Sequence, residues 1–244
     1  EIAGEELIKI FKHLTCNIEK RHTVYSSLTA GYDSRLLMAA TKEISSKVKY
    51  YTFKLPNQKE DYIDYTVPKK ITTDLNLNYS SINIKKLPMD IRENVLDSYD
   101  YPRLKPFEQY RNIFPKNKKE NILLVGFVSE VAKNYLESVK VKNGKDIVRA
   151  VHLPDNDYLE NYYQNWLNKN QKTITDYNYE LLDFIHWEQD ITNFAGQNTY
   201  YAHHYVRLFS IFNCREILRI MLSVPTKERD GKSPIFFKYL IKNM

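Results

Sequence analysis

One short segment, residues 27–35 (SLTAGYDSR), carries residue types that could bind an anion. It closes a β-branched and aromatic run that predicts a strand, and it opens a pattern that predicts a helix from Ser34. Small residues at 29–31 allow a tight turn in which several main-chain N–H groups point at one spot. The positive end of the following helix faces the same spot. The segment therefore predicts an anion-binding turn, with a strand–turn–helix that binds nothing as the alternative.

Side chains in this turn extend its chemistry. Thr29 and Ser34 offer hydroxyl donors to a phosphate group. Asp33 has the wrong charge for a phosphate contact, but it suits a magnesium ion that bridges phosphates. In an open α/β sheet, a turn of this kind lies at the carboxyl end of a strand, where ligands bind.

The elements around the turn predict an α/β fold, because strand-like and helix-like segments alternate in the first half of the chain. Strands are expected over residues 23–29, 47–53, 78–84 and 121–125, and helices over 6–20, 34–44, 61–75 and 128–136. From about Lys145 the strand patterns stop, and helices are expected over 156–167, 177–202, 214–223 and 234–241. We therefore expect a doubly wound, mostly parallel α/β half over residues 1–144, with an all-helical half over residues 145–244 packed on it.

Composition excludes several classes of protein. The 244 residues are 43% hydrophobic and 27% charged, so the chain can bury a core and is not largely disordered. No apolar run approaches the roughly 18 residues of a membrane helix, and residues 1–6 do not resemble a signal peptide. Cys16 and Cys214 lie far apart and form no zinc motif, so we expect reduced thiols and a cytoplasmic protein.

The net charge of +6 is compatible with a nucleic-acid or a polyphosphate ligand. The lysines are dispersed along the chain rather than gathered in a stripe. We therefore expect neither a nucleic acid nor a membrane as a partner.

Residues 29–34 (TAGYDS) resemble the pyrophosphate-binding loop of ATP pyrophosphatases, whose pattern is Ser-Gly-Gly-x-Asp-Ser after the first strand. Over nearly its whole length, the chain resembles most the synthetase domain of the asparagine synthetase family. The supporting stretches look like that family's second strand, the helix after it, and its Pro-Phe-Leu-Asp segment with the helix end that follows: residues 51–53, 64–71 with 75–77, and 212–216 with 222–225. The family's amino-terminal glutaminase domain has no counterpart in this sequence.

The resemblance implies a fold of the ATP-pyrophosphatase (adenine nucleotide alpha hydrolase-like) type, with ATP and Mg²⁺ as cofactors. It implies a carbon–nitrogen ligase in which a carboxylate attacks the α-phosphate of ATP to give an acyl-adenylate and pyrophosphate. A bound amine or ammonia then forms an amide and releases AMP. The expected partners are therefore a small-molecule carboxylate and an amine or ammonia, with a glutaminase domain or subunit as the source of ammonia. The helical half would supply the acceptor pocket.

Site residues follow from the same resemblance. The residues expected to bind ATP and pyrophosphate lie in the first loop, the second strand and the turn after the fourth strand: Leu28, Thr29, Ala30, Gly31, Asp33, Ser34, Arg35, Phe53 and Gly126. Asp33 and Glu130 are expected to bind Mg²⁺, and Glu130 and Lys232 to be catalytic. Lys232 would stabilise charge on the departing pyrophosphate, with Lys227 and Arg229 as its rivals.

The sequence departs from the family pattern at three positions, and two alternative functions stay open. Thr29 replaces the serine of the loop and keeps a hydroxyl there. Ala30 replaces the first glycine of the loop, and Ser129 stands where the family has the aspartate of an Asp-Glu pair. One alternative is an enzyme that uses the same loop to adenylate a tRNA base, which the basic charge permits. The other is a nucleotide-binding module without catalysis, which Ala30 and Ser129 suggest. Pyrophosphate release separates an enzyme from a binding module.

Overall fold

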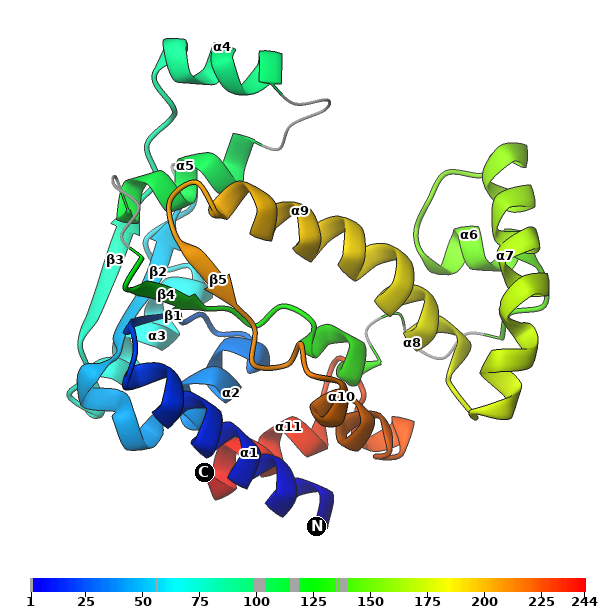
Figure 1. Ribbon diagram of the computed structural model, residues 1–244, viewed down its shortest axis with the longest axis horizontal. Helices are drawn as coiled ribbons and strands as arrows, with labels where there is room; N and C mark the ends of the chain where they lie inside the picture. Colours follow the sequence, from blue (N-terminus) through cyan, green and yellow to red (C-terminus); the bar gives the residue numbers. More distant parts are fainter. Residues whose placement is uncertain (1, 56, 99–103, 115–118, 135, 137–139) are drawn as a thin grey trace.

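The computed structural model describes residues 2–55, 57–98, 104–114, 119–134, 136 and 140–244 (Figure 1). Its centre is a parallel sheet of five strands in the order β3-β2-β1-β4-β5. The strands are β1 (Thr23–Ser27), β2 (Lys49–Lys54), β3 (Tyr79–Asn83), β4 (Asn121–Leu124) and β5 (Arg207–Phe209). The doubly wound, parallel α/β fold predicted from the alternating pattern is confirmed.

The direction in which strands are added to this sheet reverses at β1. In register, Ser26 lies opposite Tyr50 of β2 on one side and Leu124 of β4 on the other. The chain builds outward from β1 to β2 and β3, then returns to place β4 and β5 on the opposite side. The gap between the carboxyl ends of β1 and β4 is thus the topological switch point, where open α/β sheets bind ligands.

Helices of the first half connect and cover the strands. They are α1 (Ile2–Glu19), α2 (Tyr32–Ala40), the 3₁₀ turn η1 (Lys42–Lys47), α3 (Ile63–Asp74), α4 (Met89–Ser98), α5 (Leu104–Ile113) and the 3₁₀ turn η2 (Ser129–Lys133). Pro68 lies inside α3. Helices α4 and α5 were not predicted from the sequence.

The second half contains α6 (Gly144–Ala150), α7 (Asp157–Asp176), α8 (Leu181–Ile185), the π-helical turn η3 (His186–Ile191), α9 (Thr192–Ala202), α10 (Arg215–Leu222), the 3₁₀ turn η4 (Thr226–Glu228) and α11 (Ile235–Asn243). The expectation of an all-helical second half needs one correction, because β5 pairs in parallel with β4. Three residues are too short for an alternating pattern, so the neighbouring strand defines β5 rather than its own sequence. The sheet therefore draws on both halves, and the division at residue 144 stays a prediction.

Figure 1 shows α5 and α9 on one face of the sheet and α1, α2 and α11 on the other. The main core is formed by apolar side chains from the second group of helices, from the strands, and from α10 with the loop before it, among them Phe11, Val24, Leu124, Phe212 and Phe237. A separate apolar cluster joins α6, α7 and α8, which lie apart from the sheet in the figure. Among the helices that the structure describes, none combines the length and apolar character needed to cross a bilayer.

Candidate active site

The turn after β1 is anchored to the sheet. The Leu28 N–H donates to the Tyr51 carbonyl of β2 at 2.9 Å, and the Thr52 hydroxyl donates to the Leu28 carbonyl. The Leu28 side chain is fully buried. These contacts fix the point at which the chain leaves the sheet, so the residues after Leu28 start from a defined position at the switch point.

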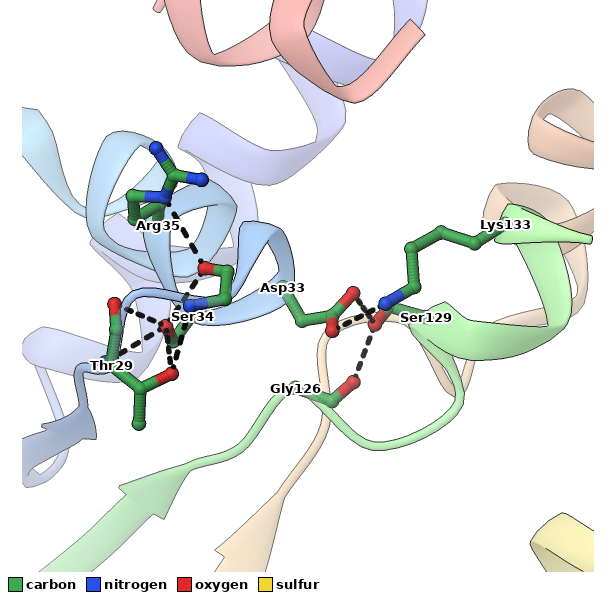
Figure 2. Close-up of polar contacts among 8 residues, drawn as sticks. Thr29, Asp33, Ser34, Arg35, Gly126, Ser129 and Lys133 are labelled. Carbon is green, nitrogen blue, oxygen red and sulfur yellow. Dashed lines mark hydrogen bonds and ion pairs between the residues drawn. The ribbon is translucent and has the colours of Figure 1, made fainter. Parts of the chain in front are cut away.

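Two hydroxyl groups shape the turn itself. The Thr29 N–H donates to Ser34 Oγ at 2.9 Å, and the Gly31 N–H donates to Thr29 Oγ1 at 3.1 Å. Thr29 Oγ1 and Ser34 Oγ lie 3.1 Å apart (Figure 2). The two side chains that the sequence offered as phosphate donors thus hold the loop in shape here. Ala30 is not among the described residues with positive φ, so its replacement of glycine strains nothing in this conformation.

Asp64, at the start of α3, is a part of this site that the sequence analysis did not assign. Its Oδ1 accepts a hydrogen bond from the Ala30 N–H at 2.9 Å. A negatively charged oxygen therefore already lies against the main chain of the loop. This is the contact expected of an anion-binding turn. A phosphate that binds at Ala30 must displace Asp64 or share the N–H with it.

Asp33 joins the loop to the turn after β4. Its Oδ1 accepts a hydrogen bond from Ser129 Oγ at 2.7 Å, and its Oδ2 lies 2.6 Å from the Lys133 ammonium (Figure 2). Ser129 Oγ also lies 2.7 Å from the Gly126 carbonyl. A Cβ atom on Gly126 would lie 2.9 Å from the Cβ of Asp33, so glycine at this position permits the close approach of the two segments. Gly126 and Asp33, both predicted site residues, are thus in contact.

The turn from Gly126 to Asn134 differs from the helix that the sequence predicted there. Only the 3₁₀ turn η2 forms, and it lies between Val128 at φ 76° and Asn134 at φ 51°. A β-branched residue rarely adopts this left-handed conformation, which costs about 1–2 kcal/mol. The strained turn brings Ser129 and Lys133 to one carboxylate, and strain of this kind is typical of functional sites.

Glu130 lies close to Asp33 in a largely buried position. Burial raises the pKa of its carboxyl above the ordinary value, and the negative charge of Asp33 raises it further. The charges of Lys133 and His186 act in the opposite direction. Glu130 Oε2 is buried and has no hydrogen-bond partner among the described residues. A cation placed between Glu130 and Asp33 would relieve both the repulsion and the missing contact.

This donor set fits a magnesium ion that is shared with a substrate. Within the described part of the chain, no group of three or more His, Cys, Asp or Glu side chains is arranged to hold a metal alone. Mg²⁺ is commonly held by one or two carboxylates, with substrate phosphates and water as the remaining ligands. Asp33 and Glu130 supply these two carboxylates, and Lys133 is the cation that now neutralises Asp33.

The charged turn near the carboxyl end requires one correction. Arg229, a predicted rival of Lys232, is 2% exposed and forms an ion pair with Asp183 at 3.0 Å. Its Nε also donates to the Val224 carbonyl at 2.8 Å, so this side chain is committed to the interior. Lys232 is exposed, and its N–H donates to Asp230 at 2.7 Å. Its catalytic role stays a prediction.

The end of this turn lies near the loop after β1. The Lys238 ammonium contacts Ser233 Oγ at 2.9 Å and lies 5.7 Å from the ring centre of Tyr32. Arg35 stacks its guanidinium 4.3 Å from the same ring centre. Positive side chains therefore border the loop on the side of α11, which favours an anionic ligand there.

A cavity of about 520 Å³ opens at the switch point between the carboxyl ends of β1, β2 and β4. Phe53 and Gly126, both predicted to bind the nucleotide, line it together with the aromatic side chains of Tyr51, Tyr110 and Phe127. Burial raises the pKa of both tyrosines, so they remain neutral at physiological pH. The cavity is within the usual size range of small-molecule sites, and its aromatic walls suit a planar ring.

Comparisons with known proteins do not assign this chain to a family. No protein-family model and no curated protein matches it. An NH₃-dependent NAD synthetase from Campylobacter jejuni is 14% identical, with 80% of this chain and 94% of that chain aligned and a TM-score of 0.38. A U34-tRNA thiolase from Methanococcus maripaludis is 11% identical over 88% of this chain and 80% of that chain, with a TM-score of 0.28. At these levels neither similarity carries a functional argument, so the resemblance to asparagine synthetases stays a prediction and function must be argued from the site.

Proposed function

We propose that this chain binds ATP with Mg²⁺ at the switch point and uses it to adenylate a carboxylate. The observation that carries the proposal is the pairing of two features at one place. One is a loop whose Ala30 N–H already donates a hydrogen bond to a carboxylate oxygen, that of Asp64. The other is the Asp33–Glu130 pair, in which Glu130 Oε2 is buried without a partner among the described residues.

Each part of the site would then have one task. The cavity lined by Phe53 and Gly126 would hold adenine, and the loop would hold the phosphates. Mg²⁺ at Asp33 and Glu130 would neutralise negative charge on the phosphates. Lys133 would leave Asp33 Oδ2 when that oxygen takes up the metal, and its ammonium would then be available to a phosphate oxygen.

The reaction inferred from these parts is acyl transfer through AMP. The substrate carboxylate attacks the α-phosphorus, the bond to the β-phosphate breaks, and pyrophosphate leaves. A second substrate, an amine or ammonia, then attacks the activated carbonyl to form an amide and release AMP. This second step rests only on the resemblance to asparagine synthetases. That the chain belongs to this family is part of the proposal.

ATP with Mg²⁺ should raise the melting temperature of the protein, because a ligand that binds only the folded state stabilises it by mass action. At a ligand concentration 100 times the Kd, the gain is about 2.7 kcal/mol, or roughly 5–10 °C for a chain of this size. The measurement is a thermal scan with ATP and Mg²⁺, each alone and together, followed by calorimetric titration. GTP is the control for the adenine cavity. No shift and no heat at millimolar ATP would contradict the proposal.

Asp33→Asn should weaken the magnesium-dependent part of ATP binding by about tenfold or more, because an amide is a poor ligand for Mg²⁺. The melting temperature of the free protein should change little. Loss of the ion pair with Lys133 destabilises the variant, whereas removal of the negative charge relieves the raised pKa of Glu130. Calorimetry with and without Mg²⁺ measures the first effect. The exposed Asp74→Asn, at the end of α3, is the matched control for loss of one negative charge. An Asp33→Asn protein that fails to fold would instead identify Asp33 as a structural residue.

A further inference from the structure

A second cavity, of about 440 Å³, lies between α9 and the carboxyl ends of β4 and β5. Val125 and Phe127 line both this cavity and the 520 Å³ cavity assigned to the nucleotide, so the two cavities share a wall. The Phe127 ring meets the Phe194 ring of α9 edge to face, with 5.8 Å between their centres. Val128 also lines the second cavity, directly before Ser129, which donates to Asp33. A molecule in this cavity would therefore adjoin the proposed reaction centre.

The described lining of this cavity contains no Asp, Glu, Lys, Arg or His. Charged residues make up 27% of the chain, and the cavity beside α3 is lined by Lys54, Glu60 and Lys69. Apolar side chains, among them Trp187 and Ile191 of η3, form much of the wall, and the polar side chains of Thr192, Thr199, Ser210 and Asn213 form the rest. A charged group in this cavity would gain no side chain of opposite charge among the described lining residues.

The hydroxyl groups in the lining do not change this conclusion, because their protons are already used. Thr199 Oγ1 donates to the Ala195 carbonyl at 2.7 Å, and Thr192 Oγ1 donates to the Trp187 carbonyl at 3.4 Å. Ser210 Oγ donates to the Phe127 carbonyl. A carboxylate inside the cavity would meet lone pairs at these oxygens rather than O–H donors, and neutral groups such as the Asn213 amide could donate to it but would not balance its charge.

From these observations we infer that this cavity holds the body of the acceptor acid, and that this body is uncharged and mainly apolar, such as an aryl or branched alkyl group. The carboxylate of the acid points out of the cavity, toward residues 126–130 and the α-phosphate. The inference rests on the adenylation proposed above and assigns a substrate class to it. It disfavours aspartate, whose ammonium and second carboxylate would both enter a neutral space.

Gly196 offers a direct way to close the cavity. It lies on α9 in the lining, and a Cβ atom added there meets no heavy atom within 4 Å. Gly196→Leu should therefore fill the space without a clash with the backbone. Gly196→Ala is the matched control, since it makes the same change to the helix backbone and adds only one carbon atom.

The experiment measures acid binding by saturation-transfer NMR in the absence of ATP, with 3-phenylpropanoate and aspartate as probes. We expect the unaltered protein and Gly196→Ala to bind 3-phenylpropanoate equally, Gly196→Leu to bind it at least tenfold more weakly, and aspartate to show no transfer. Equal binding of 3-phenylpropanoate to Gly196→Leu, binding of aspartate, or no binding of 3-phenylpropanoate at millimolar concentration would each overturn the inference. The experiment contains no ATP, so its result does not depend on ATP binding. A protein that fails to bind ATP would contradict the proposed function, and the acid-binding result could still be interpreted.

Discussion

Arg229→Met is expected to destabilise the protein by about 3–5 kcal/mol, the usual effect of removing one partner from a buried ion pair. Arg229 and Asp183 are 2% and 5% exposed, and they join the turn after η4 to α8 across 46 residues of sequence. Methionine fills much of the space of the arginine stem but leaves the Asp183 carboxylate buried without its cation. Chemical denaturation of the variant at neutral pH, followed by circular dichroism, measures this loss.

The same variant should show a distinct dependence on pH. Burial raises the pKa of Asp183 above its ordinary value, and it outweighs the lowering effect of the Arg229 charge and hydrogen bond. Glu180 adds to the raised pKa, whereas His186 opposes it. Without Arg229, the pKa of Asp183 rises further. A group whose pKa is higher in the folded state favours folding at low pH and loses that contribution as the pH rises through its folded-state pKa. The difference between Arg229→Met and the unaltered protein should therefore shrink as the pH falls.

A double variant separates the ion pair from simple packing. Asp183→Asn with Arg229→Met removes both charges, so it should recover much of the stability lost in Arg229→Met alone. If the double variant is as unstable as the sum of the two single variants, the ion pair is not the cause. A loss below about 1 kcal/mol in Arg229→Met would mean that the turn is not held by this contact.

The loop after β1 could be predicted from the sequence because its chemistry lies in consecutive residues. A strand, small residues, hydroxyls and a helix start are all local signals, and the structure places the loop at the carboxyl end of β1 as expected. The contacts that complete the site are not local. Asp64 reaches Ala30 from 34 residues away, and Lys133 reaches Asp33 from 100 residues away. No pattern in one sequence states which distant side chains will meet.

The elements that were not predicted from the sequence form for physical reasons that can be named. The strand β5 is three residues long and exists because it pairs with β4. Helix α6 is short, yet the Asn143 side chain caps it by accepting a hydrogen bond from the Asp146 N–H. An asparagine before a helical run is a recognised start signal, so α6 could have been predicted from the sequence. The burial of Arg229 could not have been predicted, because the charged residues around it at 227–232 resemble a solvated turn.

This burial changes how the role of Lys232 must be tested. Arg229→Ala cannot serve as a control for loss of positive charge, because it would also break the ion pair with Asp183. Lys227 lies in the same turn, is exposed, and carries the same charge, so Lys227→Ala is the matched control. Stability should be measured first for both lysine variants, and neither should lose more than about 0.5 kcal/mol, as is usual for surface substitutions.

Lys232→Ala should then lower kcat by roughly a hundredfold, the size of effect expected when one preorganised donor to a developing charge is removed. Its expected partner is the negative charge that builds up as pyrophosphate leaves, so its contribution belongs to the transition state. ATP affinity should change little, because the ground-state contacts are assigned to the loop at 29–34 and to the cavity lined by Phe53. The measurement is the rate of pyrophosphate release, with the Kd for ATP determined separately by calorimetry. Equal losses of kcat in Lys232→Ala and Lys227→Ala would indicate that the lysines of this turn contribute only general positive charge at the edge of the site. Weaker ATP binding in Lys232→Ala with no turnover in any variant would favour a module that only holds the nucleotide.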